Sequence, residues 1–163
     1  MKVTQFHTQV SVKIENALKK MLKGTVPVMS TDRLADSRNR DLDWCILDSR
    51  ELVEFEVSHL PDAKWVGHLD FSMSRVSNIP KSTRIVVYCS IGVRSENIAE
   101  KLMATGFSDV WNLYGGIFSW ANEQKKLIEQ NHKSTLAVHG YNQKWATLLV
   151  HHTHCKQTKK VAS

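Results

Sequence analysis

Short apolar runs alternate with helical patterns along most of this chain, and the alternation limits the fold more than any other feature. Five runs are typical of buried strands: TVPVM (25–29), WCIL (44–47), KWVG (64–67), RIVVY (84–88) and DVWNL (109–113). Helical patterns follow at residues 30–37, 50–57, 71–77, 95–106 and 116–127. Strands that alternate with helices pair in parallel and carry helices on both faces. The sequence therefore predicts an α/β fold with one parallel sheet.

Residues 95–106 form the most strongly marked helix. Its predicted buried face consists of Ile98, Ala99, Leu102 and Met103, and Gly106 lies where a left-handed cap would end the helix. Ser30 is a candidate cap for the helix of residues 30–37.

Both ends of the chain extend beyond the alternating region. Upstream, an amphipathic helix is predicted with one apolar face, made of Val10, Ile14, Ala17, Leu18 and Met21. Downstream, GYNQKWATLLV (140–150) is one more apolar segment. We predict a helical extension at residues 1–25, a single domain at 26–127, and a C-terminal extension with a polar basic tail at 128–163.

The net charge of +6 is concentrated at the two ends. Residues 1–29 hold five Lys and one acidic residue, and residues 131–163 hold five Lys and no acidic residue. Residues 30–130 hold twelve basic and fifteen acidic residues. A nucleic-acid-binding domain would carry a basic stripe with interleaved aromatic residues across its body. We therefore expect solvated, lysine-rich ends and no nucleic-acid partner.

Targeting and cysteine patterns both favour a cytoplasmic protein. The first residues lack the apolar core of a signal peptide, and no segment approaches the roughly 18 apolar residues that cross a bilayer. Cys45, Cys89 and Cys155 are too few and too widely spaced for a disulfide framework, and none belongs to a CxxC pair. We expect a reducing compartment and no membrane partner.

Cys89 stands where a predicted buried strand ends, in the stretch VVYCSIGVRS (86–95). Residues 89–94 are then a strand-to-helix loop at the carboxyl edge of the sheet, where open α/β sheets bind ligands. Gly92 allows a tight turn, and the loop N–H groups together with the helix N-terminus form an anion cradle. Such surroundings favour the thiolate and make Cys89 a candidate nucleophile. The alternative is a small buried apolar residue at a strand end.

The remaining cysteines and histidines are weaker candidates. Cys45 lies inside a predicted strand, where core packing is expected. The tail holds enough ligands for a metal, but they are nearly contiguous: His151, His152, His154 and Cys155. Structural metal sites draw their ligands from separated segments, so we predict a solvated tail and no metal.

Two segments together resemble the rhodanese sulfurtransferase domain. YCSIGVRS followed by FSDVWNLYGGIFSWANE is similar to the active loop and closing segment of that family, and LDSRELVEFEVSHLPDA is similar to its other characteristic segment. In that segment Asp48 and Arg50 end a strand, Glu54 follows on a helix, and His59 introduces the next strand. The resemblance covers residues 26–127.

The resemblance implies a five-stranded parallel sheet flanked by helices on both faces, in which the cysteine loop follows the fourth strand, beside the second. It also implies a single-domain sulfurtransferase that moves a sulfane sulfur through a Cys89 persulfide. The implied donor is a small thiosulfate-like anion or mercaptopyruvate, and the acceptor is a thiol or cyanide, protein thiols included. No metal or organic cofactor is required. Family members often carry a basic residue just after the cysteine, where this chain has Ser90 and Ile91, so the donor stays open.

We assign substrate binding to Arg50 and to the loop residues that follow the cysteine, which are Ser90, Ile91, Gly92, Val93, Arg94 and Ser95. Arg94 has two open roles, contact with an anionic donor or with a nearby carboxylate. Arg50 and Glu54 are spaced as an i,i+4 helix pair, an alternative to substrate binding. Asp48, Glu54 and His59 are expected to support the loop structurally, and the YGG at 114–116 to meet a turn requirement.

Two other functions remain open. Cysteine phosphatases and arsenate reductases need an arginine six positions after the cysteine to fork onto an oxyanion, whereas Arg94 is five positions after Cys89. A binding or regulatory module with incidental sulfur chemistry is the second alternative. The oligomeric state is not predicted.

Overall fold

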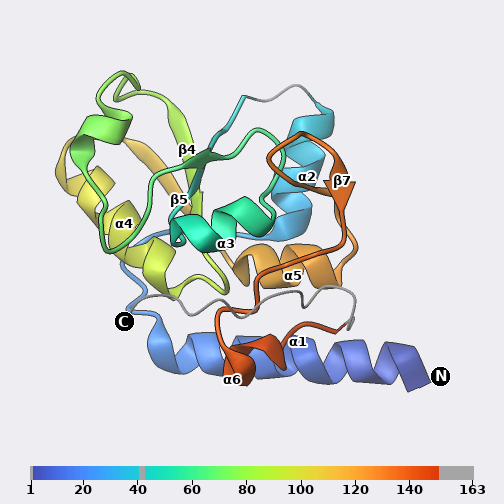
Figure 1. The fold of residues 1–163 in the computed structure, drawn as a ribbon. Coiled ribbons are helices and arrows are strands. Elements are labelled where there is room, and N and C mark those ends of the chain that lie inside the picture. The colour runs from blue at the N-terminus through green and yellow to red at the C-terminus, as the bar shows by residue number, and fades with distance from the viewer. Residues whose placement is uncertain (1, 41–42, 151–163) are drawn as a thin grey trace.

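A computed structural model describes residues 2–40 and 43–150, and it contains a five-stranded parallel sheet between layers of helices (Figure 1). The strands are β1 (Val28–Met29), β2 (Cys45–Asp48), β3 (Lys64–Trp65), β4 (Arg84–Tyr88) and β5 (Asp109–Leu113). Their spatial order is β1-β5-β4-β2-β3, and every pairing is parallel. This confirms the predicted fold class. Since β4 is central, the residue that follows it lies at the middle of the carboxyl edge.

The helices occupy the predicted places, with different ends. They are α1 (Lys2–Met21), α2 (Thr31–Asn39), α3 (Leu52–Val57), α4 (Val93–Ala104), α5 (Gly116–Asn122) and α6 (Gln143–Ala146), with a 3-10 turn, η1 (Met73–Val76). The Ser30 side chain caps α2 by accepting the N–H of Arg33, as predicted. A small antiparallel pair, β6 (Leu127–Ile128) and β7 (Ser134–Thr135), was not predicted.

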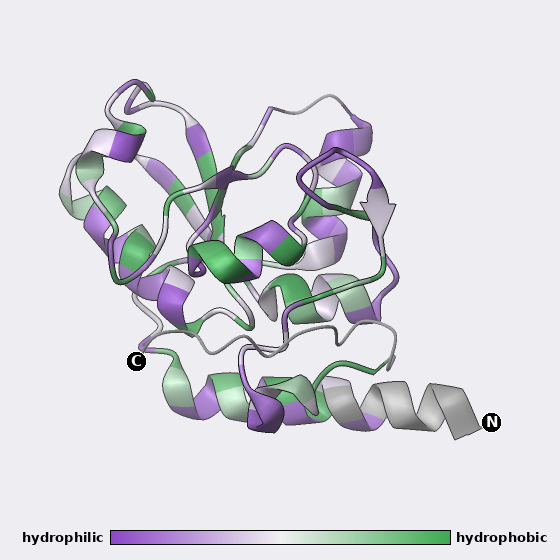
Figure 2. Cartoon of the chain, in the orientation of Figure 1, coloured by the Kyte–Doolittle hydropathy of each residue, from purple (hydrophilic) through white to green (hydrophobic). Residues whose placement is uncertain are grey.

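Alternation along β4 divides the core into two clusters. Ile85 and Val87 belong to the cluster that contains the apolar face of α4, and Val86 and Tyr88 belong to the cluster that contains α1, α2 and α5. Helices on the outside mix hydrophilic and apolar residues along their length, as elements with one buried face do (Figure 2). The predicted face of α4 is buried except for Met103, which is 41% exposed. Met103 lies at the margin of the apolar stripe.

The upstream amphipathic helix exists as α1, which runs along the outside of the molecule below α5 and beside α6 (Figure 1). Ile14 and Leu18 are buried in the same cluster as α5, Ala17 packs against it, and Met21 is 43% exposed. The Val10 side chain lies outside the described part of the structure. The burial of Ile14 and Leu18 makes α1 part of the main core. Burial of one Leu side chain stabilises the folded state by roughly 1.5–3 kcal/mol.

A buried carboxylate fixes the turn between α1 and β1. Glu96, in the first turn of α4, accepts the backbone N–H groups of Lys23, Gly24 and Thr25 at 2.9, 2.9 and 3.3 Å. Glu96 is 2% exposed. The end of α1 is therefore held against the start of α4.

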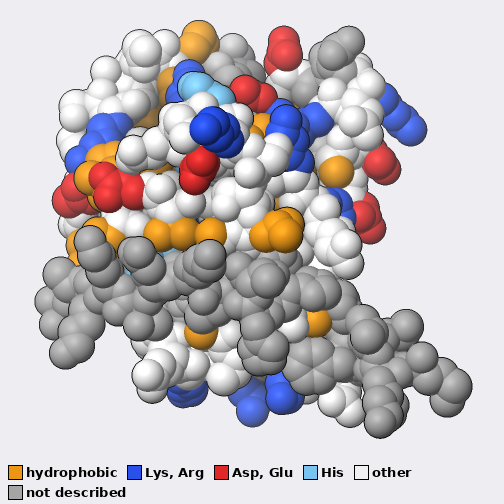
Figure 3. All heavy atoms as spheres, turned by 45° about the vertical axis from the view of Figure 1, so that its right-hand side comes forward, with side chains coloured by type: hydrophobic (Ala, Val, Ile, Leu, Met, Phe, Trp, Pro, Cys, Tyr) orange, Lys and Arg blue, Asp and Glu red, His pale blue; other side chains and the backbone are white. Residues whose placement is uncertain are grey.

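Charges on the described surface are interspersed in sign. Lys and Arg side chains lie among Asp and Glu side chains on the face drawn in Figure 3, in keeping with the nearly balanced charge of residues 30–130. Within residues 2–40 and 43–150, the helices are all too short or too polar to cross a membrane.

Candidate active site

The loop between β4 and α4 begins with Cys89 and closes at Gly92. Gly92 is the cap of α4 and has φ +128°, a conformation that L side chains rarely adopt. Helix α4 begins at Val93, two residues before the predicted start. The Gly92 N–H donates to Cys89 Sγ at 3.2 Å. The sulfur therefore lies inside the loop, at the N-terminal end of a twelve-residue helix, where the helix dipole favours negative charge.

Ser95 and Asn112 form a second set of contacts around the sulfur. Ser95 Oγ lies 3.4 Å from Cys89 Sγ and 2.7 Å from Asn112 Oδ1. A hydroxyl has one proton, so Ser95 donates to one of these acceptors at a time. Asn112 Nδ2 also donates to the Gly92 carbonyl at 2.9 Å. Asn112, from the neighbouring strand β5, therefore positions both the turn and Ser95.

Helix α5 approaches the cysteine loop from the other side. The N–H groups of Ile117 and Phe118 donate to the Cys89 and Ser90 carbonyls, both at 3.0 Å. Gly116 has φ +54°, and a Cβ placed there would lie 2.4 Å from the Cys89 carbonyl oxygen. The YGG segment therefore meets a turn requirement, as predicted, and it also allows the helix to contact the loop backbone.

Glu54 and Arg94 form an ion pair beside the loop, in which the Arg94 side chain is 16% exposed. Arg94 Nη1 and Nη2 donate to Glu54 Oε2 and Oε1 at 2.7 and 2.8 Å, and Nη2 also donates to Ser90 Oγ at 2.9 Å. The Glu54 side chain is fully buried. Burial opposes its charge, but the hydrogen bonds and charge of Arg94 outweigh burial and lower the pKa of Glu54 below its ordinary value of 4.5. Of the two open roles for Arg94, the structure has the carboxylate contact.

A second buried ion pair lies behind the loop. Arg50 Nη2 donates to Asp48 Oδ2 at 2.7 Å and to the Ser58 carbonyl at 2.7 Å, and the side chains of Arg50 and Asp48 are fully buried. The Tyr88 hydroxyl also donates to Asp48. Tyr88 directly precedes Cys89, so this pair supports the strand end that carries the cysteine.

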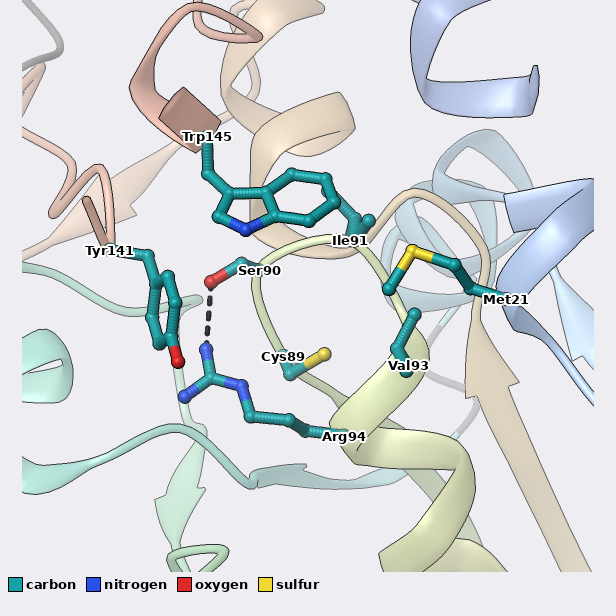
Figure 4. A pocket seen from close by; sticks show the side chains of 8 residues that line it. All are labelled: Met21, Cys89, Ser90, Ile91, Val93, Arg94, Tyr141 and Trp145. Carbon is teal, nitrogen blue, oxygen red and sulfur yellow. Dashed lines mark hydrogen bonds between the residues drawn. The ribbon is translucent and has the colours of Figure 1, made fainter. Parts of the chain in front are cut away.

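A pocket of about 140 Å³ opens beside Cys89 (Figure 4). Eight residues from three separate parts of the chain line it: Met21, Cys89, Ser90, Ile91, Val93, Arg94, Tyr141 and Trp145. The Arg94 guanidinium lies 4.8 Å from the centre of the Tyr141 ring, a cation–π distance. Cys89 itself is only 1% exposed, so a reactant reaches its sulfur through this pocket.

A family model described as the rhodanese-like domain matches residues 30–123. The chain belongs to the rhodanese family. A relative named Sulfurtransferase, from Allochromatium vinosum, is 36% identical over 98 residues, which are 60% of this chain and 87% of that protein. In a solved rhodanese-like domain protein from Staphylococcus aureus, 28% identical, the match covers 58% of this chain and 90% of that one, with a TM-score of 0.54.

Some rhodanese relatives are much longer than this chain. A protein named tRNA uridine(34) hydroxylase, from Onion yellows phytoplasma, is 33% identical over 86 residues, which are 50% of this chain and 28% of that protein. The similarity is therefore limited to a part of the hydroxylase of about the size of one rhodanese domain.

The rhodanese loop brings most predicted site residues together. Ser90, Ile91, Val93 and Arg94 line the pocket with Cys89, while Gly92 and Ser95 contact the sulfur.

Arg50 differs from the prediction. It is fully buried and paired with Asp48, so it has no surface to offer a substrate. The i,i+4 pair with Glu54 is also absent among the described contacts, because Arg50 precedes Glu51, the cap of α3, and lies outside the helix. Glu54 pairs with Arg94 instead.

His59 is buried and is not among the residues that line the pocket beside Cys89. Its Nδ1 is 3.1 Å from the Phe55 carbonyl, and its ring stacks on Phe55 at 3.9 Å. Burial lowers the pKa of His59. From these contacts we propose a structural role for His59.

Four residues around the site were missed by sequence reasoning: Met21, Asn112, Tyr141 and Trp145. An Asn inside the otherwise apolar run DVWNL was the one available signal, since a buried amide needs hydrogen-bond partners.

The predicted tail ligands, from His151 to Cys155, lie outside the described residues. Within the described ranges, acidic, His and Cys side chains form no cluster suited to a metal.

Replacing Glu54 with glutamine is expected to destabilise the protein at neutral pH by about 3 kcal/mol, because Arg94, whose side chain is only 16% exposed, loses its counter-charge. The lowered pKa of Glu54 means that its ionised form adds stability above the unfolded pKa, and that this contribution is lost as the pH falls through the folded pKa. The stability difference between wild type and Glu54→Gln should therefore shrink below about pH 4.5. Urea unfolding at several pH values measures it.

Asp62→Asn is the matched control for Glu54→Gln. Asp62 also pairs with an arginine, Arg38, but its side chain is 83% exposed, so the replacement should cost about 1 kcal/mol or less. A Glu54→Gln effect no larger than this, or one that stays constant on acidification, would contradict the assigned role of the buried pair.

Proposed function

We propose that this protein is a sulfurtransferase in which Cys89 carries the transferred sulfur as a persulfide. Membership of the rhodanese family and the relative named Sulfurtransferase support this reaction class. The observation that carries the proposal is the position of Cys89 Sγ, which accepts the Gly92 N–H at 3.2 Å inside a loop that opens into a pocket. A sulfur in this position is directed at the reactant and held by a donor that favours negative charge.

In the first half-reaction, the Cys89 thiolate attacks the outer sulfur of a donor such as thiosulfate. The new S–S bond joins Cys89 to this sulfur, the original S–S bond breaks, and sulfite leaves with the electron pair. The product Cys89–S–S⁻ keeps one negative charge. The loop N–H of Gly92 and the N-terminal end of α4 stabilise this charge.

In the second half-reaction, an acceptor such as cyanide or a thiolate attacks the terminal sulfur of the persulfide. The bond to the acceptor forms, the S–S bond to Cys89 breaks, and the Cys89 thiolate returns. With cyanide as the acceptor, the persulfide and cyanide give thiocyanate and the cysteine thiolate, and no oxidant or reductant is needed. The cycle therefore requires one nucleophilic side chain and the surrounding N–H groups.

Mass spectrometry after exposure to thiosulfate tests the proposal. We expect the intact protein to gain the mass of one sulfur atom, and peptide analysis to locate it on Cys89. Cyanide should then remove it and release an equal amount of thiocyanate. Wild-type protein that gains no sulfur on Cys89 from thiosulfate, mercaptopyruvate or an organic thiosulfonate would refute the proposal.

Cys45 provides the matched control for this experiment. It lies within β2, and burial raises the pKa of its thiol, so it is a poorer nucleophile at neutral pH. A Cys45→Ser variant should load sulfur as the wild type does. Loading that follows Cys45 rather than Cys89 would contradict the mechanism.

A further inference from the structure

The walls of the pocket beside Cys89 are mainly apolar. Met21, Ile91, Val93, Tyr141 and Trp145 supply carbon atoms around the sulfur (Figure 4). Two of its polar groups are already satisfied, because Arg94 is paired with Glu54 and the Ser90 hydroxyl is bonded to both. The pocket therefore offers a reactant a cysteine and an apolar surface, and little free charge.

Three of the residues that line the pocket lie outside residues 30–123, the part that matches the family model. Met21 is the last residue of α1, while Tyr141 and Trp145 belong to the segment around α6. In Figure 4 the Trp145 ring and the Met21 side chain lie on two sides of the opening above Cys89. The flanking segments of this chain thus complete the pocket.

Two buried side chains, Glu96 and Asn122, hold the flanking segments against the domain. Glu96 fixes the turn that follows Met21 through three backbone N–H groups. At the other end, Asn122 of α5 donates to the Leu148 carbonyl and accepts the Val150 N–H, both at 2.9 Å. Both flanking segments are therefore tied to the domain core close to the residues that line the pocket.

The size of the pocket limits what it can hold. Its volume is about 140 Å³, and a cavity of about 150 Å³ lined by apolar side chains accommodates a benzene ring. Two exposed lysines, Lys20 and Lys144, line an adjoining hollow that shares Met21 and Trp145. The approach is positively charged, while the pocket itself suits one ring or a short branched chain.

From these observations we infer that the sulfur donor carries a compact apolar group beside its reacting sulfur, selected by Met21 and Trp145. The inference rests on the proposed function and names its substrate class: organic, singly charged sulfane donors. An aryl thiosulfonate is a representative probe. The Cys89 thiolate attacks its terminal sulfur, the S–S bond of the donor breaks, and the aryl sulfinate leaves with the electron pair while its ring stays in the apolar pocket.

The test compares kcat/KM for benzenethiosulfonate, methanethiosulfonate and thiosulfate, with cyanide as the acceptor. The first two donors have the same charge and the same type of leaving group, and differ in the apolar group. We expect the wild type to prefer the benzene compound by about tenfold or more. Met21→Ala and Trp145→Ala should each reduce this preference at least about threefold.

The ratio of kcat/KM for the two thiosulfonates is compared between each variant and the wild type, so differences in the intrinsic reactivity of the donors cancel. Trp145→Phe keeps an aromatic wall and should keep most of the preference, and Leu136→Ala, at a side chain that is 62% exposed and outside the pocket, should leave it unchanged. Thermal unfolding identifies any variant that fails to fold, and Met21, at the surface, provides an independent second replacement.

The outcomes separate this inference from the function on which it depends. Absence of sulfur on Cys89 with all three donors would refute both. Loading by all three donors, with a benzene-to-methane preference that is the same in wild type, Met21→Ala and Trp145→Ala, would overturn the inference and leave the sulfurtransferase function standing.

Discussion

The Cys89→Ser variant is expected to lose sulfur transfer by about three orders of magnitude or more while remaining folded. A serine hydroxyl stays protonated at neutral pH and forms no persulfide, so neither half-reaction proceeds. The replacement is nearly isosteric, and the Gly92 N–H that donates to Cys89 Sγ can donate to an oxygen in the same place. Thiocyanate formation measures the loss, and thermal unfolding measures the fold.

Cys45→Ser is the appropriate comparison, since Cys45 is on the same sheet but within β2. Its transfer rate should stay within about threefold of the wild type, in the range of small indirect effects. If Cys89→Ser retained wild-type transfer with an unchanged unfolding temperature, another group would carry the sulfur and the proposed mechanism would be wrong.

The Arg50→Met variant is expected to lower the free energy of unfolding by about 3–5 kcal/mol. Methionine keeps the stem of the side chain but leaves Asp48 as a buried charge without its cation, since both side chains are fully buried. The Ser58 carbonyl also loses the hydrogen bond from Arg50 Nη2. Chemical denaturation monitored by tryptophan fluorescence measures the change.

Arg38→Met is the control for the charge itself. Arg38 pairs with Asp62 at 2.6 Å, but Asp62 is 83% exposed, so the loss should be about 1 kcal/mol or less. Equal costs for the two arginine variants would mean that Asp48 is not held as a buried charge by Arg50.

The central strands of the sheet were more predictable from sequence than the edge strands. The β4 and β5 runs were predicted with the bounds that the structure has, because the buried strands of a parallel sheet are short runs rich in apolar residues. The edge strands β1 and β3 are two residues long, shorter than the predicted runs. The pair β6 and β7 was missed because two residues carry no periodic pattern.

Site residues close to Cys89 in the sequence were predictable, and contacts between residues far apart in the sequence were not. The place of Cys89 followed from the end of a strand and a glycine three positions later. The partner of Glu54 did not, because Arg94 is 40 positions away and the i,i+4 rule favoured Arg50. Tyr141 and Trp145 reach the pocket from more than 50 residues beyond Cys89, a distance over which local patterns give no information.

Because the site depends on α1, the segment that matches the family model is not sufficient to form it. A fragment limited to residues 30–123, the part matched by the family model, would omit the edge strand β1 and the buried Ile14 and Leu18. It would also leave the Glu96 carboxylate without the three N–H groups that it accepts. The segment that matches the family model is thus smaller than the part of the chain that packs into one core, and residues 30–123 transplanted into another protein would lack Met21, Tyr141 and Trp145 of the pocket.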